Sequence, residues 1–252
     1  MRGMLAAGLI GLALGGTPTR ADEVKVLTTG AFKQALLALI PAFEARTGHR
    51  VAVENDTAGG VARRIREGAA FDLVVLTPGG IDDLVKAGTV APESRTDLAR
   101  VGVGVAARAG APRPDIGTVE AFRQELLGAR SVAYIDPRSG GSSGIYVDGL
   151  VERLGIAEAV RAKAVLVPGG YAAERVASGE AELAVQQISE ILPVAGVELV
   201  GPLPAEIQTV TTYTAALNAA AQPGPARALL DALSGPDAAA VLAQKGMTPP
   251  VR

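Results

Sequence analysis

The stretch FDLVVLTPGGIDDLVKAGTV, residues 71–90, contains one complete strand-to-helix unit. Its first seven residues, Phe71 to Thr77, form an apolar and β-branched run that is typical of a strand. Pro78 follows directly, and proline is favoured in the first turn of a helix because its missing N–H is not needed there. The residues after Pro78 predict an amphipathic helix. This unit sets the pattern for the rest of the chain.

The same alternation extends upstream of the unit. Residues 23–30 (EVKVLTTG) predict a strand, and residues 31–48 predict a helix that stops at Gly48 and is interrupted or kinked by Pro41. Residues 49–56 (HRVAVEND) predict the next strand, and residues 58–70 the next helix. Three strand–helix units in a row indicate a parallel sheet with binding loops at the carboxyl ends of its strands.

Downstream, residues 98–110 and 207–220 predict two long strands that flank a second set of α/β units, and two short helices follow within residues 224–246. The chain would leave a first lobe, build a second and return. We therefore predict an α/β protein with mixed and parallel sheets and a ligand cleft between two lobes. Lobe one would comprise residues 22–100 plus 211–252, and lobe two residues 101–210.

The first residues predict a cleavable export signal, residues 1–21. Arg2 precedes an apolar run from Met4 to about Gly16, and small residues stand one and three positions before a cut after Ala21. This run is too short for a permanent membrane anchor. We therefore expect the mature protein to act in the periplasm.

Composition narrows the classes of function. The 252 residues are 48% hydrophobic and carry a formal net charge of −2, which gives no reason to expect a nucleic-acid partner. The chain has no cysteine and one histidine, His49, in a turn between a helix and a strand. Zinc, haem and iron–sulfur sites are therefore not expected, and we predict neither a metal nor a cofactor.

The loop DPRSGGSSGIY, residues 136–146, lies between a predicted strand and a predicted helix. Its glycines, Gly144 among them, free the backbone, and Ser139, Ser142 and Ser143 place hydroxyl groups before the helix. This loop is either a capped helix start or a cradle in which N–H and hydroxyl groups hold an anion. A second loop of this kind, VPGGYAAE, contains Gly170 and Tyr171.

Four stretches together resemble the type II periplasmic solute-binding proteins, and among them the molybdate-binding family. They are VLTTGAFKQAL (26–36), FDLVVLTPGGIDDLVKAG (71–88), DPRSGGSSGIY (136–146) and VASGEAELAVQQISEI (176–191). The resemblance covers nearly all of the mature chain. It implies that the protein holds one small anion between its lobes and delivers it to an inner-membrane ABC permease. We expect the protein to be a monomer.

Three positions depart from the family pattern. Where the family commonly has Ser, Ser and Tyr, this chain has Ala31, Leu76 and Gln187. Neighbouring threonines could supply the missing hydroxyls, and the cations Lys33 and Arg138 would suit the carboxylates of an organic acid. The anion is therefore either a molybdate-like oxyanion or an organic carboxylate. The predicted ligand-binding residues are Thr28, Thr29, Gly30, Lys33, Thr77, Arg138, Ser139, Ser142, Ser143, Gly144, Gly170, Tyr171 and Gln187.

An enzyme is the alternative. Some exported proteins of this appearance resemble aconitate isomerase, which moves a double bond in a small tricarboxylate by proton transfer. Such chemistry needs an acid, a base and cations for the carboxylates. The candidates are Tyr146, Glu190, Lys33 and Arg138. His49 is expected at the far edge of its lobe, away from any site.

Overall fold

The computed structural model describes residues 22–221 and 224–251, so the predicted export signal at residues 1–21 lies outside it. The first part of the chain consists of three strand–helix units and one long strand. In order they are β1 (Glu23–Thr29), α1 (Gly30–Thr47), β2 (Arg50–Asp56), α2 (Ala58–Arg66), β3 (Leu73–Leu76), α3 (Pro78–Lys86), the 3₁₀ helix η1 (Pro92–Ser94) and β4 (Thr96–Arg108).

The second part adds further α/β units before the chain returns. In order they are α4 (Val119–Gly128), β5 (Val132–Ile135), η2 (Pro137–Ser139), α5 (Ser142–Arg153), α6 (Ala157–Arg161), β6 (Ala164–Val167), α7 (Ala173–Ser178), β7 (Leu183–Gln187), α8 (Ile188–Ile191), β8 (Val197–Pro202), η3 (Ala205–Ile207), β9 (Val210–Leu217), α9 (Pro225–Ser234) and α10 (Ala238–Gln244).

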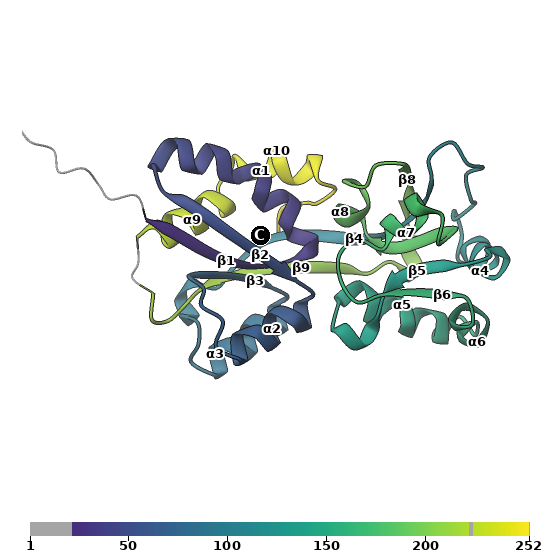
Figure 1. Cartoon of the computed structure of the whole chain (residues 1–252), viewed down its shortest axis with the longest axis horizontal. Coiled ribbons are helices and arrows are strands. Elements are labelled where there is room, and N and C mark those ends of the chain that lie inside the picture. Colours follow the sequence, from purple (N-terminus) through teal and green to yellow (C-terminus); the bar gives the residue numbers. More distant parts are fainter. Residues whose placement is uncertain (1–21, 222–223, 252) are drawn as a thin grey trace, which may run out of the picture.

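The strands lie in the order β2-β1-β3-β9-β4-β7-β5-β6, and β8 pairs with β4. Pairing is parallel among β1, β2 and β3 and among β5, β6 and β7, whereas β4 and β9 pair antiparallel with their neighbours. Strand β4 pairs with β9 through Gly102 and with β7 from Val103 onward. The two long strands thus run from one half of the molecule into the other (Figure 1). The predicted α/β class with mixed sheets is confirmed.

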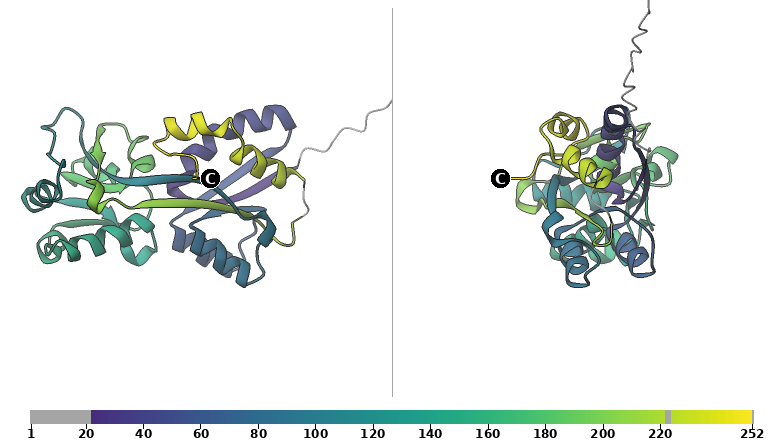
Figure 2. Two further views of the ribbon diagram at one scale, coloured as in Figure 1. Left: turned by 180° about the vertical axis from the view of Figure 1, so that it is seen from behind. Right: turned by 90° about the vertical axis from the view of Figure 1, so that its left-hand side faces the viewer.

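We call the half that contains β1–β3 and α1–α3, with α9 and α10, lobe one, and the half that contains α4–α8 and β5–β8 lobe two. The view from behind, on the left of Figure 2, shows the same two halves joined by β4 and β9. The residue boundaries of the lobes given above, after residues 100 and 210, stay a prediction.

Helices cover both faces of the sheet in each lobe. In lobe one, α1, α9 and α10 enclose one apolar cluster around Phe32 and Phe43, and α2 and α3 enclose another around Val61 and Ile81. Lobe two repeats this arrangement with two clusters of its own. Strands buried on both faces are continuously apolar, and all four residues of β3 are buried, as are all four of β5. This burial explains why both strands could be recognised in the sequence.

The ends of the helices follow local rules, with one exception. Helix α1 ends before Gly48, which has φ 75°, a left-handed conformation that favours glycine, and its N–H donates to the carbonyl of Glu44. Helix α3 begins at Pro78, as predicted. The expected interruption at Pro41 is wrong, because α1 continues through this residue as one helix. Helix α8 and strand β8 were not predicted.

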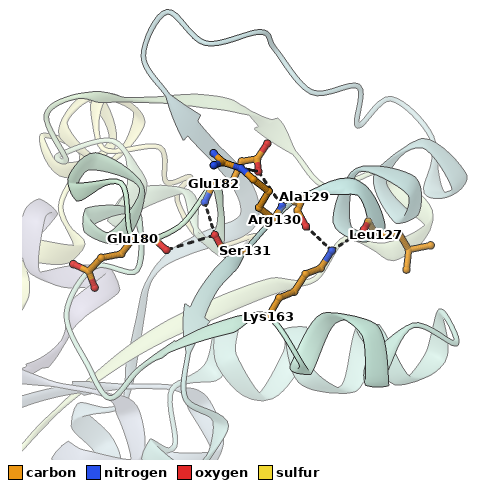
Figure 3. A network of polar contacts seen from close by, with 7 residues as sticks. All are labelled: Leu127, Ala129, Arg130, Ser131, Lys163, Glu180 and Glu182. Atoms are coloured by element: carbon orange, nitrogen blue, oxygen red, sulfur yellow. Dashed lines mark hydrogen bonds and ion pairs between the residues drawn. The ribbon is translucent and has the colours of Figure 1, made fainter.

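At the end of lobe two farthest from lobe one, charged side chains hold neighbouring segments together (Figure 3). The Lys163 ammonium donates to the carbonyls of Leu127 and Ala129, at the C-terminal end of α4. Glu182 accepts from the backbone N–H and from the guanidinium of Arg130, at 2.9 and 3.0 Å. A cation at a helix C-terminus is favourable because it meets unpaired carbonyls. These contacts tie α4, β5 and β7 together.

Candidate ligand-binding site

A cavity lies where strands of the two lobes end. Its empty volume is about 360 Å³, including the part open to solvent. The residues on its wall come from the carboxyl ends of β1, β2, β5 and β7, from the loop after β6, and from β9. They are Thr29, Gly30, Ala31, Asn55, Asp56, Thr57, Ala58, Ile135, Gly141, Ser142, Ser143, Gly170, Gln187, Glu190 and Tyr213. In α/β sheets this is the place where ligands bind.

Two helices begin at the cavity, one from each lobe. Helix α1 starts at Gly30 and helix α5 at Ser142, and neither has an acidic residue in its first turn or a side chain that caps its N–H groups. The hydroxyl of Thr29, just before α1, is buried without a hydrogen-bond partner among the described residues. Free N–H groups at a helix N-terminus attract anions. Both ends are therefore suited to hold one.

A cluster of uncharged polar side chains forms another part of the wall. The Gln187 amide donates to the hydroxyls of Ser142 and Tyr213, each at 2.9 Å. The two hydroxyl oxygens lie 3.5 Å apart, and either can be the donor. Since each hydroxyl has one proton and only one can serve the contact between them, at least one is left to donate to a ligand.

Hydrogen bonds between the lobes border the cavity. Thr57 donates its hydroxyl to the carbonyl of Ser139 at 2.6 Å, and the N–H of Gly59 donates to the carbonyl of Gly140 at 3.1 Å. The Gln34 amide donates to the Tyr171 hydroxyl at 2.7 Å. Three bonds, from α1, from α2 and from Thr57 just before α2, reach η2 and the loops of lobe two and hold the lobes together in a closed arrangement.

The closed contact depends on two glycines that face each other. A Cβ placed on Gly59 would lie 2.8 Å from the Cα of Gly140, and one placed on Gly140 would lie 2.7 Å from the Cα of Gly59. Both distances are shorter than real side chains show, and both partners are backbone atoms that cannot rotate away. No residue with a side chain fits at either position while the lobes are closed.

One buried carboxyl group, that of Glu190, lies on the cavity wall. Only 6% of the residue is exposed. Burial raises the pKa of Glu190 to about 8, and a hydrogen bond from Gln186 partly opposes the shift. Burial also raises the pKa of Tyr213, and the neighbouring Glu190 adds to that increase. At neutral pH the Glu190 carboxyl therefore carries its proton.

Seven of the residues predicted for binding or catalysis lie on the wall. They are Thr29, Gly30, Ser142, Ser143, Gly170, Gln187 and Glu190. Ser139 and Tyr171 lie beside it and join the lobes instead, through the bonds described above. Gly144 is packed over the carbonyl of Ile135, since a Cβ there would lie 2.1 Å from that oxygen.

The remaining predicted residues do not reach the wall. Arg138 is 83% exposed and pairs with Asp136 at 2.7 Å, so this cation turns away from the cavity. Lys33 stands one turn into α1, and Thr77 precedes α3. The buried Thr28 hydroxyl points to the carbonyl of Thr29 at 3.4 Å. The structure therefore does not bring the two expected cations together at the cavity.

Tyr146, a candidate acid or base, also lies elsewhere. Its hydroxyl donates to the carbonyl of Ile207, and the Arg153 guanidinium lies 5.2 Å from the centre of its ring. Both contacts are within lobe two, on the side of α5 that packs against the core. His49 accepts from the N–H of Asp22 at the start of β1, which is the end of the sheet opposite to the cavity.

Sequence reasoning missed one whole side of the site. Asn55, Asp56 and Thr57 end β2 and begin α2, and Tyr213 lies in β9. The signal for the first three was present, because a polar run directly after a predicted strand lies at the same edge as the other strand ends. Tyr213 had no such signal, since it stands in the middle of a long strand.

Neither a metal site nor a membrane span appears in the described part of the chain. Residues 22–221 and 224–251 contain no group of three or more His, Cys, Asp or Glu side chains placed to hold a metal ion. They also contain no helix that is both long and apolar enough to cross a membrane.

Comparison with known proteins gives one family. Residues 24–248 match the family model of bacterial extracellular solute-binding proteins. A curated relative, an aconitate isomerase from a Pseudomonas species, is 34% identical over 249 residues, which cover 94% of each chain.

Similar solved structures include a periplasmic molybdate-binding protein from Azotobacter vinelandii, with a TM-score of 0.76, 23% identity and coverage of 90% of this chain and all of that one. A sulfate-binding protein from Mycobacterium tuberculosis has a TM-score of 0.72 and 21% identity, and the match covers 90% of this chain and 87% of that one. These identities show a shared fold, the periplasmic binding protein type II fold.

The raised pKa of Glu190 predicts how stability depends on pH. As the pH rises above the ordinary pKa of glutamate, the unfolded chain ionises at this residue while the folded chain stays protonated up to about pH 8. Stability from this group is therefore full at low pH and is lost as the pH rises through that window. Glu190→Gln removes the loss and should stabilise the protein at pH 8 by on the order of a few kcal/mol relative to its effect at pH 4.5.

Thermal melts of wild type and Glu190→Gln at both pH values measure this difference. The exposed Glu174→Gln in α7 is the matched control, and it should change the melting temperature little at either pH. An equal effect of Glu190→Gln at pH 4.5 and pH 8 would show that the carboxyl is not held protonated.

Proposed function

Because this chain belongs to the family of bacterial extracellular solute-binding proteins, we propose that it captures one small anion in the cavity between its lobes. The observation that carries the proposal is the meeting of two uncapped helix N-termini, those of α1 and α5, at one cavity. Each contributes N–H groups that need an acceptor, and the two come from opposite lobes. An anion between them would accept hydrogen bonds from both lobes and so stabilise the closed form.

The chemistry of the wall describes the ligand. Among the described residues no lysine or arginine is part of the wall, so the donors are backbone N–H groups, hydroxyls and the amides of Asn55 and Gln187. Preorganised uncharged donors in a buried site can hold an anion without a cation. Such a site suits a compact oxyanion or a single carboxylate group of an organic acid. These are the two ligand classes that the sequence leaves open.

The partners follow from the family. We propose that the mature protein works in the periplasm as a monomer and that its closed form docks on an inner-membrane ABC permease. The three bonds between the lobes define the surface that a permease would distinguish from an open form. We propose no nucleic acid partner and no cofactor.

Isomerisation of a small tricarboxylate is the second candidate. The relative that is 34% identical over 94% of the chain is an aconitate isomerase, and Glu190 places a protonated carboxyl on the cavity wall. A double-bond shift needs a group that takes a proton from one carbon and returns one to another. A carboxyl with a pKa near 8 takes the proton in its ionised form, which becomes populated as the pH approaches 8, and returns one in its protonated form. Of the four catalytic candidates, Glu190 is the one that lines the cavity.

The ligand class can be tested by thermal shift, because a ligand that binds only the folded state raises the melting temperature. We expect the protein from Asp22 onward to be stabilised by at least one of molybdate, tungstate, sulfate, phosphate, citrate, cis-aconitate and trans-aconitate. Ser142→Ala together with Ser143→Ala should weaken that ligand about 10- to 100-fold, since hydrogen bonds to charged groups are lost. The exposed Ser178→Ala is the control. Unchanged affinity of the double variant would remove the start of α5 from the site.

Proton exchange distinguishes the two candidates. In heavy water an isomerase should introduce deuterium into cis- or trans-aconitate and interconvert the two, which proton NMR detects. Glu190→Gln should abolish the exchange, because an amide cannot accept the proton. Stabilisation by an aconitate without exchange would favour capture alone, and exchange by Glu190→Gln at the wild-type rate would exclude this carboxyl as the proton carrier.

Closure can be tested at Gly59. Gly59→Ala places a methyl group 2.8 Å from the Cα of Gly140 only when the lobes are closed, so it should weaken ligand binding at least tenfold. In an open form the same change should leave stability equal or higher, because alanine favours helix α2. Gly79→Ala is a matched control, since Gly79 is the second residue of α3, as Gly59 is of α2, and nothing lies within 4 Å of its Cβ position. Equal affinities of the two variants would contradict the closed contact.

A further inference from the structure

Glu190 is placed as a contact between the lobes. It lies on the short helix α8, three residues beyond Gln187, and its carboxyl reaches the first residue of α1. A Cβ on Gly30 would lie 2.6 Å from its Oε1 atom, so the carboxyl is seated directly against the Cα of Gly30. This is the same helix N-terminus that is proposed to hold the ligand. The carboxyl and the proposed anion site therefore lie side by side at one helix N-terminus.

No cation accompanies this carboxyl. The ion pairs of the described residues involve neither Glu190 nor Lys33, the basic residue nearest in sequence to Gly30. The titratable groups around it are Tyr213 from β9, Tyr171 from the loop before α7, and Asp56 from β2 on the same wall. None of these groups can neutralise a negative charge.

We propose that Glu190 acts as the proton switch of the cavity: the anion binds while this carboxyl is protonated and is repelled when it is ionised. The proposal rests on capture of an anion at the cavity. In the protonated form the carboxyl O–H donates to the ligand and adds a strong hydrogen bond. In the ionised form two negative charges would lie within a few ångströms in a buried site, where they repel strongly. An ionised Glu190 would also occupy the N-terminus of α1 itself and so compete with the ligand.

Protonation of Glu190 should strengthen anion binding, and anion binding should favour protonation of Glu190. Burial already holds the pKa of Glu190 at about 8, and a bound anion would raise this pKa further. Affinity should therefore be constant below about pH 7 and fall by up to about tenfold per pH unit above pH 8, and binding at pH 9 should take up close to one proton. Glu190→Gln keeps a donor without a titrating proton, so its affinity should vary less than about threefold over the same range.

The test is calorimetric titration of wild type, Glu190→Gln and Glu174→Gln with molybdate and with trans-aconitate from pH 6 to pH 9.5. The predicted loss of affinity lies above pH 8, where both probes are fully ionised, so a pH dependence there belongs to the protein. Repeating the pH 9 titration in two buffers of different ionisation enthalpy counts the protons taken up. We expect uptake by wild type and by Glu174→Gln and none by Glu190→Gln.

Each outcome decides a different point. If wild type and Glu190→Gln show the same pH profile, or if wild type takes up no proton at pH 9, the switch is refuted while capture of the anion stands. If neither probe binds wild type at pH 6, where the carboxyl is protonated, both the switch and the proposed capture of these anions fail. If Glu190→Gln does not fold, proton uptake by wild type still decides the question.

Discussion

Strands β4 and β9 pair antiparallel between Thr96 and Gly102, and the rest of the molecule depends on this pairing. Because β4 continues beyond Gly102 to pair with β7 and β8, one strand belongs to the sheets of both lobes. The parallel strands of each lobe then end at the gap between them, where their loops and helix N-termini meet. A cleft in this position is a result of topology, and it exists before any particular side chain is chosen.

The groups that line this cleft favour an anion although none of them is positively charged. Each cation that might have served is absent from the wall, and Arg138 is already neutralised by Asp136. What remains are N–H groups, hydroxyls, the amides of Asn55 and Gln187, the Asp56 carboxyl, which accepts from the N–H of Thr57, and the Glu190 carboxyl that burial keeps protonated. Since no lysine or arginine of the described residues lies on this wall, the wall avoids the cost of burying an unpaired cation. Its selectivity depends on donor geometry and on the proton of Glu190.

The fold could be predicted from the sequence where local physics is decisive. Strands buried on both faces, Pro78 at a helix start and Gly48 at a helix end are all visible in the printed residues. The resemblance to the solute-binding family led to Gln187, the composition of its loop led to Ser142, and both residues line the cavity. Rules based on local sequence fail where tertiary contacts decide the structure. Helix α1 continues through Pro41, and the one-turn helix α8 is too short to show a helical period of apolar residues.

Within the site, tertiary contacts also explain most of the differences between the predicted and the observed residues. The Arg138 guanidinium pairs with the carboxylate of Asp136, two residues earlier. The sequence allows this contact but does not require it. Tyr213 reaches the cavity only because β9 crosses between the lobes. Asp56 and Thr57 follow the same strand-end rule as Ser142, and that rule applied to β2 would have found them.

The contact between Gly59 and Gly140 also acts as a gauge of ligand size. It joins backbone to backbone, so it contains no side chain that could adjust to a wider separation. A ligand that keeps the lobes about an ångström farther apart would stretch the bonds from Gly59 and from Thr57 beyond hydrogen-bonding distance together. Larger molecules would therefore be bound by one lobe without the complete closed state, and only a ligand within a narrow range of dimensions completes it.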